Sequence, residues 1–507
     1  MSKYRICVQI FKNMKPKKNN IALYFSDIFG VSEQDLEHYG AFNISLRTDL
    51  PLFIDPFLLF NSEKHEYQEL HDQMIRYLKF LRTKSLSGSV SLELVKAWYK
   101  FSEVKQNWLG FCQTSNTGRG LGRDFANALN INLVNVFQDF GNEKITRGSH
   151  LEKLCLIKSG VGRDMISDFT TNLIKDYLLH FTEDFAKENI EKEMRQKFSI
   201  PRAKFSYDLE RWMPETYELP FFKGDYVILT PKDLLTKDDN WINHSDMIHR
   251  FEEIPDAIEN NELRTQINNY FQRVLASYED PTKEEYNRLI YDTLAKFPAL
   301  IDYYIKLKED SGEEAIISSA MKVLESDRLY IKQFGQLAFL LHQQTPFYAV
   351  SGNTRDETLQ KIKFFKDVIE NKGGHHIFYV GNVPIKKEDD VHILFRLVWH
   401  GTLSDVSREV NDGRGPADFK ISRGAMDKTI VEFKLARNTQ LKRNLQKQVE
   451  IYKKASDAQT GLKVIIFFSE DEQIKVEGIL QELGLWGDPN IILVDARKDN
   501  KPSASKA

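Results

Sequence analysis

The sequence predicts a layered α/β domain in the last third of the chain, with a central mixed sheet flanked by helices, joined to a larger, mainly helical α+β region. Strand-like and helical patterns alternate from about residue 355 onward, and the unbroken apolar run Val464–Phe468 suits a strand buried on both faces. Between about 243 and 345 the pattern is charge-rich and mostly helical. A chain of 507 residues exceeds one compact core, so we expect an N-terminal region over 1–240, a helical connector over 241–350, the α/β domain over 351–498 and a disordered tail over 499–507.

The N-terminal region has one clear amphipathic pattern and one apolar segment. A helix is predicted over about 67–82 because its apolar positions follow the three-four spacing of one buried face, namely Leu70, Met74, Tyr77, Leu78 and Leu81. Residues 50–60, with Asp55 among prolines and aromatics, are typical of a core or an interface. The run 225–230 is strand-like and ends at Pro231. We expect this region to recognise a target, to form oligomers or to restrain the C-terminal domain.

A polar stripe in the N-terminal region has two interpretations. Asp164, Asp168 and Asn172 recur every four residues and would line one face of a helix. They would then form a second acidic site or bind a partner. Alternatively, Asp164 caps the helix and the remainder is ordinary surface polarity. The sequence leaves both interpretations open.

In the α/β domain the elements follow one another closely. Helices are predicted over 355–372, 388–400, 439–456 and 472–483. Strands are predicted over 405–410, 417–422, 429–435, 464–468 and 491–494, the second and third forming a hairpin. Alternation of these two kinds of element is what predicts the layered arrangement.

Composition excludes several classes of protein. Net charge is -3, so nucleic-acid binding has to rest on a local basic surface. The three cysteines, Cys7, Cys112 and Cys155, lie far apart without a CxxC pair, which argues against a zinc site or a disulfide framework. No apolar run approaches the ~20 residues that span a bilayer, and the first residues lack a signal-peptide pattern. We therefore expect a cytoplasmic protein without membrane contact.

The hairpin of the α/β domain brings together residues with the chemistry of phosphodiester hydrolysis. Because side chains alternate along a strand, Glu432 and Lys434 share one side while apolar Val431 and Phe433 take the other. Asp418, on the preceding strand, can pair beside Glu432. Two converging carboxylates suit Mg²⁺ or Mn²⁺, and a nearby ammonium can position the attacking water. The sequence thus predicts a divalent-metal site with a lysine beside it.

Three motifs in this order resemble a known family. They are Pro416-Ala-Asp418, Glu432-Phe-Lys434 and Gln448-x3-Tyr452. Together they resemble the PD-(D/E)XK, or restriction-endonuclease-like, nucleases, and the last motif resembles that of the RecB-like branch. The resemblance covers roughly 355–497 and departs from the family pattern in one place, since Ala417 separates the proline from the aspartate.

The resemblance implies a role for each matching residue. Asp418, Glu432 and the backbone carbonyl of Phe433 would bind Mg²⁺ or Mn²⁺, and Lys434 would be the catalytic lysine. Gln448 and Tyr452 would shape the site or contact the substrate. Members of the family often add an acidic residue from a helix before the core, for which Glu388 is the first choice and Glu409 the second.

Basic side chains after the hairpin support a nucleic-acid substrate. Arg437, Lys442, Arg443 and Lys447 lie in or just before the helix that follows. A solvated helix face is the alternative interpretation. We expect a Mg²⁺-dependent endonuclease that cuts DNA in prokaryotic antiphage or restriction-type defence, acting as a homo-oligomer or with a partner defence protein. The alternatives are an RNA-directed nuclease and a catalytically inactive nucleic-acid-binding or regulatory module.

Overall fold

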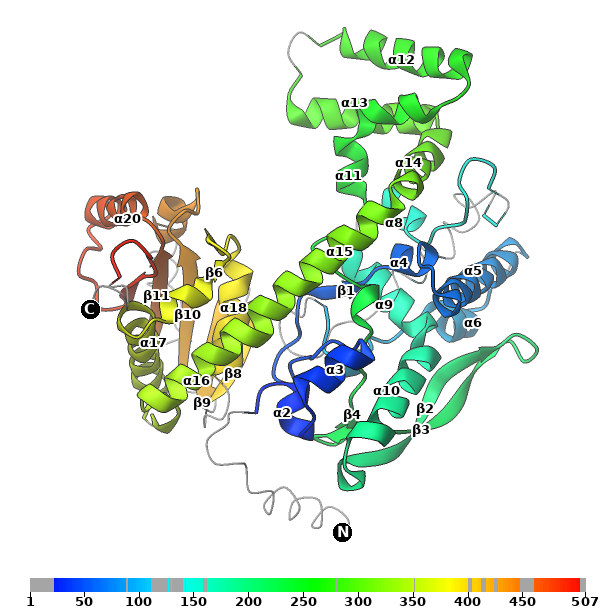
Figure 1. Cartoon of the computed structure of the whole chain (residues 1–507). Coiled ribbons are helices and arrows are strands. Elements are labelled where there is room, and N and C mark those ends of the chain that lie inside the picture. Colours follow the sequence, from blue (N-terminus) through cyan, green and yellow to red (C-terminus); the bar gives the residue numbers. More distant parts are fainter. Residues whose placement is uncertain are drawn as a thin grey trace.

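The computed structural model of the chain is shown in Figure 1. It describes residues 22–87, 90–110, 126, 129, 140–141, 143–157, 162–278, 281–350, 352–399, 404–411, 416–423, 427–446 and 460–501. Within these, 405, 407–411, 416–418 and 460 are placed as strand backbone only. Along the described residues no helix combines the length and the apolar character that crossing a bilayer requires.

The N-terminal region is a mixture of helices and short sheets. Its helices are α2 (Phe25–Phe29), α3 (Glu33–Tyr39), α4 (Pro56–Phe60), α5 (His65–Leu86), α6 (Leu92–Leu94), α8 (Lys153–Ile157), α9 (Arg163–Leu173) and α10 (Lys175–Asn189). Its strands are β1 (Leu52–Ile54), β2 (Arg195–Ser206), β3 (Arg211–Phe222), β4 (Asp225–Tyr226) and β5 (Leu235–Lys237). Strands β2, β3 and β4 form an antiparallel sheet, and β1 pairs with β5.

Two predictions for this region are confirmed. Helix α5 covers the predicted 67–82, and all five apolar positions of its stripe are buried. The segment 50–60 lies in the core, where Asp55 is fully buried and accepts hydrogen bonds from the backbone N–H groups of Phe57 and Trp241. Asp55 therefore begins helix α4 and fixes the loop near Trp241, a structural role in a buried carboxylate.

The strand predicted over 225–230 is only partly right. Strand β4 ends at Tyr226, although Val227 to Thr230 are buried. The N–H of Val227 donates to Pro220, that of Ile228 to Gln106 and that of Leu229 to the hydroxyl of Thr182. The backbone N–H groups of Val227 to Leu229 thus donate to three different elements instead of one neighbouring strand. These residues therefore do not extend the pairing of β4.

Helices make up the connector, as predicted. They are α11 (His244–His249), α12 (Asn261–Leu275), α13 (Lys283–Lys296), α14 (Ala299–Asp310), α15 (Gly312–Ser326) and α16 (Phe334–Gln344). A π-helical segment, η6 (Asp327–Gln333), joins α15 to α16, so the two continue as one long helix. Figure 1 shows this helix running from the arm formed by α11 to α14 to the C-terminal domain.

The C-terminal domain is built on a mixed five-stranded sheet. Its strands are β8 (Asp405–Asn411), β9 (Pro416–Arg423), β10 (Asp427–Leu435), β11 (Thr460–Phe467) and β12 (Ile491–Asp495), in the order β12-β11-β10-β9-β8. Strands β8, β9 and β10 are antiparallel neighbours, whereas β10, β11 and β12 are parallel. The expected mixed sheet is confirmed, and each predicted strand of this domain is present.

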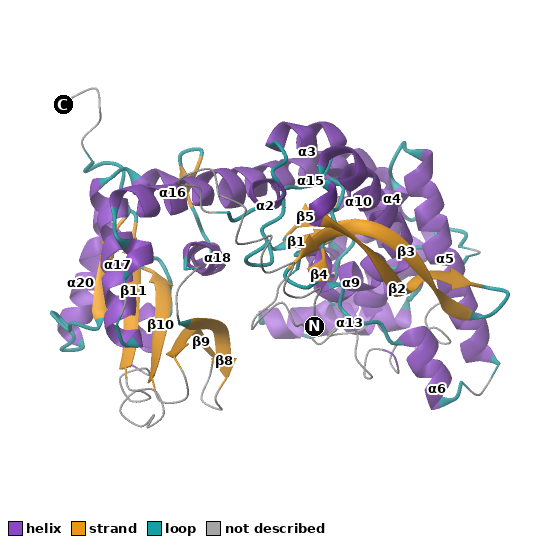
Figure 2. Ribbon diagram, turned by 90° about the horizontal axis from the view of Figure 1, so that it is seen from below, coloured by secondary structure: helices purple, strands orange, loops and turns teal. Residues whose placement is uncertain are grey.

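Helices cover both faces of this sheet (Figure 2). They are α17 (Thr354–Asn371), α18 (Glu388–Val398), α20 (Glu470–Glu482) and the helical residues 441–446, and a small hairpin of β6 (Tyr379–Val380) and β7 (Val383–Pro384) lies between α17 and α18 in the chain. One face packs Val431, Phe433 and Leu435 into the large core cluster with α17 and α18. The other face packs Ile465 and Phe467 against α20. The predicted burial of β11 on both faces is therefore confirmed.

The C-terminal domain does not stand apart from the rest of the chain. The large core cluster runs continuously from the N-terminal region through η6 and α16 into the sheet. Helix α18 adds polar contacts, since the hydroxyl of Tyr330 in η6 donates to Asp390 at 2.7 Å and Lys387 pairs with Asp238. The position of α18 is thus set partly by elements outside its own domain.

Candidate active site

Strand β10 carries the two residues at the centre of the predicted site. Its core-facing side chains are apolar, so Glu432 and Lys434 take the other face, as period-two alternation requires. Glu432 is buried, with 7% of its surface exposed, and the Lys434 side chain is 13% exposed. Both charged groups therefore lie in a partly desolvated environment, where electrostatic interactions are stronger than in water.

The strand register aligns the predicted carboxylates in one row. The pairing of β10 with β9 ends with Val431 opposite Phe419. Continued by one position, that register would set Asp418 opposite Glu432. On the other side of β9, Arg408 faces Phe419 and Val410 faces Ala417, which leaves Glu409 opposite Asp418. Facing positions on neighbouring antiparallel strands belong to one face of the sheet. Glu409, Asp418 and Glu432 thus occupy one row across three strands, although the side chains of Glu409 and Asp418 lie outside the described residues.

Glu388 reaches this row from the first turn of α18. That turn contains Glu388, Asp389 and Asp390, three acids at the positive end of the helix dipole. Glu388 Oε2 accepts a hydrogen bond from Lys434 Nζ at 3.2 Å. Its Oε1 accepts from the backbone N–H of Leu435 at 3.2 Å and from Asn438 Nδ2 at 2.8 Å. Both carboxylate oxygens are anchored, so Glu388 is suited to hold Lys434 in place.

A second lysine completes the row and was missed from the sequence. Lys463 on β11 faces Glu432 in the parallel register and is only 6% exposed. Burial lowers the pKa of Lys463, while the charge of Glu432 raises it and that of Lys434 lowers it. Lys463 therefore lies within electrostatic reach of both residues. The one available signal was a single lysine placed directly before the apolar run of β11.

The basic residues predicted to bind nucleic acid are only partly available for that task. Arg437 pairs with Glu472 at 3.2 Å, and Lys442 pairs with Glu482 at 2.5 Å. Both acids belong to α20, which is close in space but distant in sequence. Counting the charges within residues 434–454 therefore does not include them. Arg443 is exposed, whereas Lys447 lies outside the described residues.

Other predicted residues add little to the geometry. Phe433 places its ring in the core beside Phe395 and Phe419, which fixes the strand between Glu432 and Lys434. Gln448 and Tyr452 lie outside the described residues. Among the side chains that are described, no three histidines, cysteines or acids lie close enough together to hold a metal ion.

The polar stripe of α9 faces inward, unlike an ordinary surface. Asn172 Nδ2 donates to the carbonyl of Ser102 at 2.9 Å. Burial, with the charges of Asp164 and Glu103 behind it, raises the pKa of Asp168 to about 8. The N-cap residue of the helix is Gly162, so Asp164 lies in the first turn and does not occupy the N-cap position. The stripe belongs to a packed, acid-rich contact inside the N-terminal region.

Comparison with known proteins divides the chain into two matched parts. A family model described as Domain of unknown function (DUF8370) matches residues 30–243, and a second, Domain of unknown function (DUF8371), matches residues 354–470. No curated protein and no solved structure matches the chain. The second match contains Glu388, the row of strand residues and both lysines, so the whole candidate site falls within one family domain.

Proposed function

We propose that the C-terminal domain is a metal-dependent nuclease whose site is the row Glu409, Asp418, Glu432 and Lys463 together with Lys434 and Glu388. The observation that supports the proposal is the strand register. Continued by one position at Asp418, it sets three carboxylate residues and a lysine in one line across four neighbouring strands. A second lysine, Lys434, is held beside that line by Glu388 at 3.2 Å. Charged residues are rarely placed on the covered face of a sheet. A cluster of them at such a position therefore indicates a functional site and not packing.

The residue types in the row fit a hard divalent cation. Carboxylate oxygens are the ligands that Mg²⁺ and Mn²⁺ prefer, and Asp418 and Glu432 would hold the ion. When bound, the ion supplies charge neutralisation at a phosphate and a water of lowered pKa. Lys434 would orient the attacking water, and the anchored carboxylate of Glu388 would keep the ammonium group from rotating away.

DNA is the proposed substrate. The basic residues after β10 support a nucleic-acid substrate but do not distinguish DNA from RNA. Arg443 is exposed in the helical residues that follow β10. Arg437 and Lys442 have acidic neighbours that a phosphate backbone can replace. The resemblance to restriction-endonuclease-like proteins is the ground for proposing endonucleolytic cutting and a role in prokaryotic antiphage defence. The N-terminal region would then supply recognition or restraint.

The test is cleavage of supercoiled plasmid by the full chain with Mg²⁺, Mn²⁺ or EDTA. Asp418→Asn and Lys434→Met are expected to lower the cleavage rate by about 100-fold or more, because the first weakens metal binding and the second removes the ammonium group that orients the attacking water. Lys428→Met, on the same strand, and Asp471→Asn, on α20, are matched controls that should cut like the unaltered protein.

The outcomes separate the proposal from its alternatives. Equal cutting by both site variants and the controls would eliminate the assignment of the site. Metal-dependent cutting of single-stranded RNA but not of plasmid or single-stranded DNA would make the protein an RNA-directed nuclease. Salt-sensitive binding of nucleic acid with no hydrolysis under any metal would identify an inactive binding module.

A further inference from the structure

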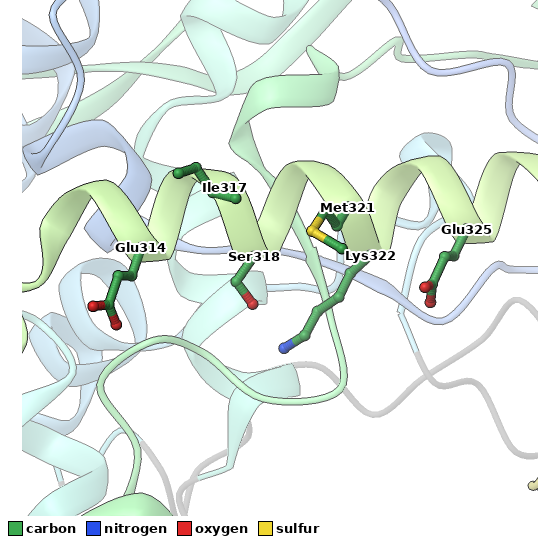
Figure 3. A pocket seen from close by; sticks show the side chains of 6 residues that line it. All are labelled: Glu314, Ile317, Ser318, Met321, Lys322 and Glu325. Carbon is green, nitrogen blue, oxygen red and sulfur yellow. The ribbon is translucent and has the colours of Figure 1, made fainter.

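Helix α15 exposes the most prominent apolar stripe along the described chain. Ile317 is 60% exposed, Met321 59% and Leu324 69%. Figure 3 shows Ile317 and Met321 on one side of the helix, with Glu314, Ser318, Lys322 and Glu325 lining the same shallow hollow. The three apolar residues follow the spacing of one helical face, so they form a stripe and not a scatter.

This stripe does not contribute to the fold. The buried side of α15 is formed by small and β-branched residues, Gly312, Ala315, Ser319, Val323 and Ser326. On that side the hydroxyl of Ser319 donates to Thr236 on β5 at 3.3 Å. The helix is therefore already anchored by its other face. Exposed apolar residues that form one contiguous stripe usually mark a surface that another molecule covers.

The ends of the stripe carry opposite charges. Glu314 precedes Ile317 by one turn, and Arg328 follows Leu324 by one turn into η6. Both are exposed, and neither forms an ion pair with any residue that the structure describes. They also lie equally far from Met321 along the chain. Lys322 and Glu325 line the same hollow between these ends. Glu314 and Arg328 are the outermost charges, and Met321 lies midway between them.

We propose that this face of α15 binds the same face of a second copy of the chain, with the two helices antiparallel across a two-fold axis at Met321. In that arrangement Glu314 of each copy meets Arg328 of the other, and the apolar residues pack between these two pairs. A parallel arrangement would set like charges against each other at both ends. A two-fold interface is self-complementary, and this stripe has that property.

The apolar contacts supply most of the association, and the charges choose its direction. A short stripe forms a small interface, and we expect weak association with a dissociation constant on the order of micromolar. The proposal is independent of the nuclease assignment, since α15 lies in the connector.

The first test is sedimentation of the full chain across roughly 1–100 µM. The unaltered protein is expected to shift from monomer to dimer, and Met321→Asp is expected to remain a monomer throughout. Ile474→Asp removes an equally exposed apolar side chain from α20 (61% exposed) and should dimerise normally. Circular dichroism and thermal unfolding check that each variant is folded.

The second test reverses the charges. Glu314→Arg alone and Arg328→Glu alone are expected to weaken dimerisation by about tenfold or more, because each places like charges together twice. The double variant Glu314→Arg/Arg328→Glu restores both pairs and should recover the original dissociation constant. A protein that stays monomeric at the highest concentration, a dimer that survives Met321→Asp, or a double variant no better than the singles would each overturn the proposal.

Discussion

Lys463 has a buried position that costs the folded protein stability. Burial lowers its pKa, so the charged form is less favourable in the folded chain than in the unfolded one, even with Glu432 opposite. A residue that is unfavourable for folding is usually retained for what it does at a site. Lys463 faces the predicted metal ligand Glu432 and lies near Lys434, which is where a phosphate would need a second cation.

We predict that Lys463→Met lowers the rate of plasmid cleavage by about tenfold or more while leaving the melting temperature equal or higher. Methionine keeps the length and the packing of the side chain but removes its charge. Cleavage kinetics and thermal unfolding are measured on the same preparations, with Lys428→Met as the control. If activity and melting temperature fall together, Lys463 is a structural residue only.

Part of the site could be predicted from single residues and part could not. Glu432 and Lys434 were identifiable because alternation along β10 separates them from Val431 and Phe433 within a few residues of sequence. Glu388 was predicted only as the first of two candidates for an additional acid. Its contact with Lys434 was not predicted, because it depends on the position of α18 relative to β10. Lys463 was missed because its partner Glu432 lies on another strand. The register between two parallel strands cannot be derived from the sequence of either strand.

At the scale of elements, α18 connects the site to the rest of the molecule. Its first turn holds Glu388 against Lys434, and two residues later Asp390 accepts a hydrogen bond from Tyr330 of η6 at 2.7 Å. A loss of that bond frees the end of α18 that carries Glu388. Small displacements of a positioning group are enough to reduce a catalytic rate.

We predict that Tyr330→Phe lowers the cleavage rate roughly fivefold or more, and the stability by about 1–2 kcal/mol, through loss of a charge-assisted hydrogen bond. Tyr67→Phe is a matched control, because the hydroxyl of Tyr67 also donates to an aspartate, Asp233, at 2.8 Å but lies in the N-terminal region. Its stability should fall similarly with no change in cleavage. Equal activities for the two variants would show that α18 does not transmit the contact.

The strands of the C-terminal domain could be predicted from local patterns, whereas the main sheet of the N-terminal region could not. Strand β11 is an apolar run, and only three residues separate the end of β9 from the start of β10, so their patterns are local. The long hairpin of β2 and β3 was missed because much of its surface faces solvent and it contains Pro201, Pro214 and Pro220. A proline argues against a strand unless the strand lies at the edge of a sheet. Whether a strand lies at an edge is decided by tertiary structure and cannot be seen in the sequence.

At the scale of the whole molecule, one buried acid of the N-terminal region, Asp49, lies within electrostatic reach of the sheet domain. Asp49 is 8% exposed, and its pKa is raised to about 7 by burial, with Arg396 of α18 lowering it and Glu103 and Asp164 raising it. Asp168 nearby has a pKa of about 8. Arg396 belongs to the same helix as Glu388, so the charge of Asp49 bears on the contact between the two parts of the chain.

The raised pKa of Asp49 sets a direction for the dependence of stability on pH. Between its ordinary value of 3.8 and about 7, the folded chain binds a proton that the unfolded chain has released. The stability contributed by the protonated carboxyl is therefore complete below about pH 4 and is lost as the pH rises through 7. From pH 5 to pH 8 this one group lowers the free energy of unfolding by about 2–3 kcal/mol.

We predict that Asp49→Asn flattens this dependence, because an amide has no proton to lose. Urea unfolding at pH 5, 6, 7 and 8 measures the slope for the unaltered chain, for Asp49→Asn and for Asp471→Asn, an exposed acid on α20 that serves as the control. The control should keep the original slope. Since Asp168 titrates in the same direction with a pKa of about 8, a residual slope is expected in Asp49→Asn, and Asp49→Asn/Asp168→Asn should remove most of it. A slope unchanged in the double variant would mean that other groups carry the dependence, and that the carboxyl facing Arg396 is ionised throughout.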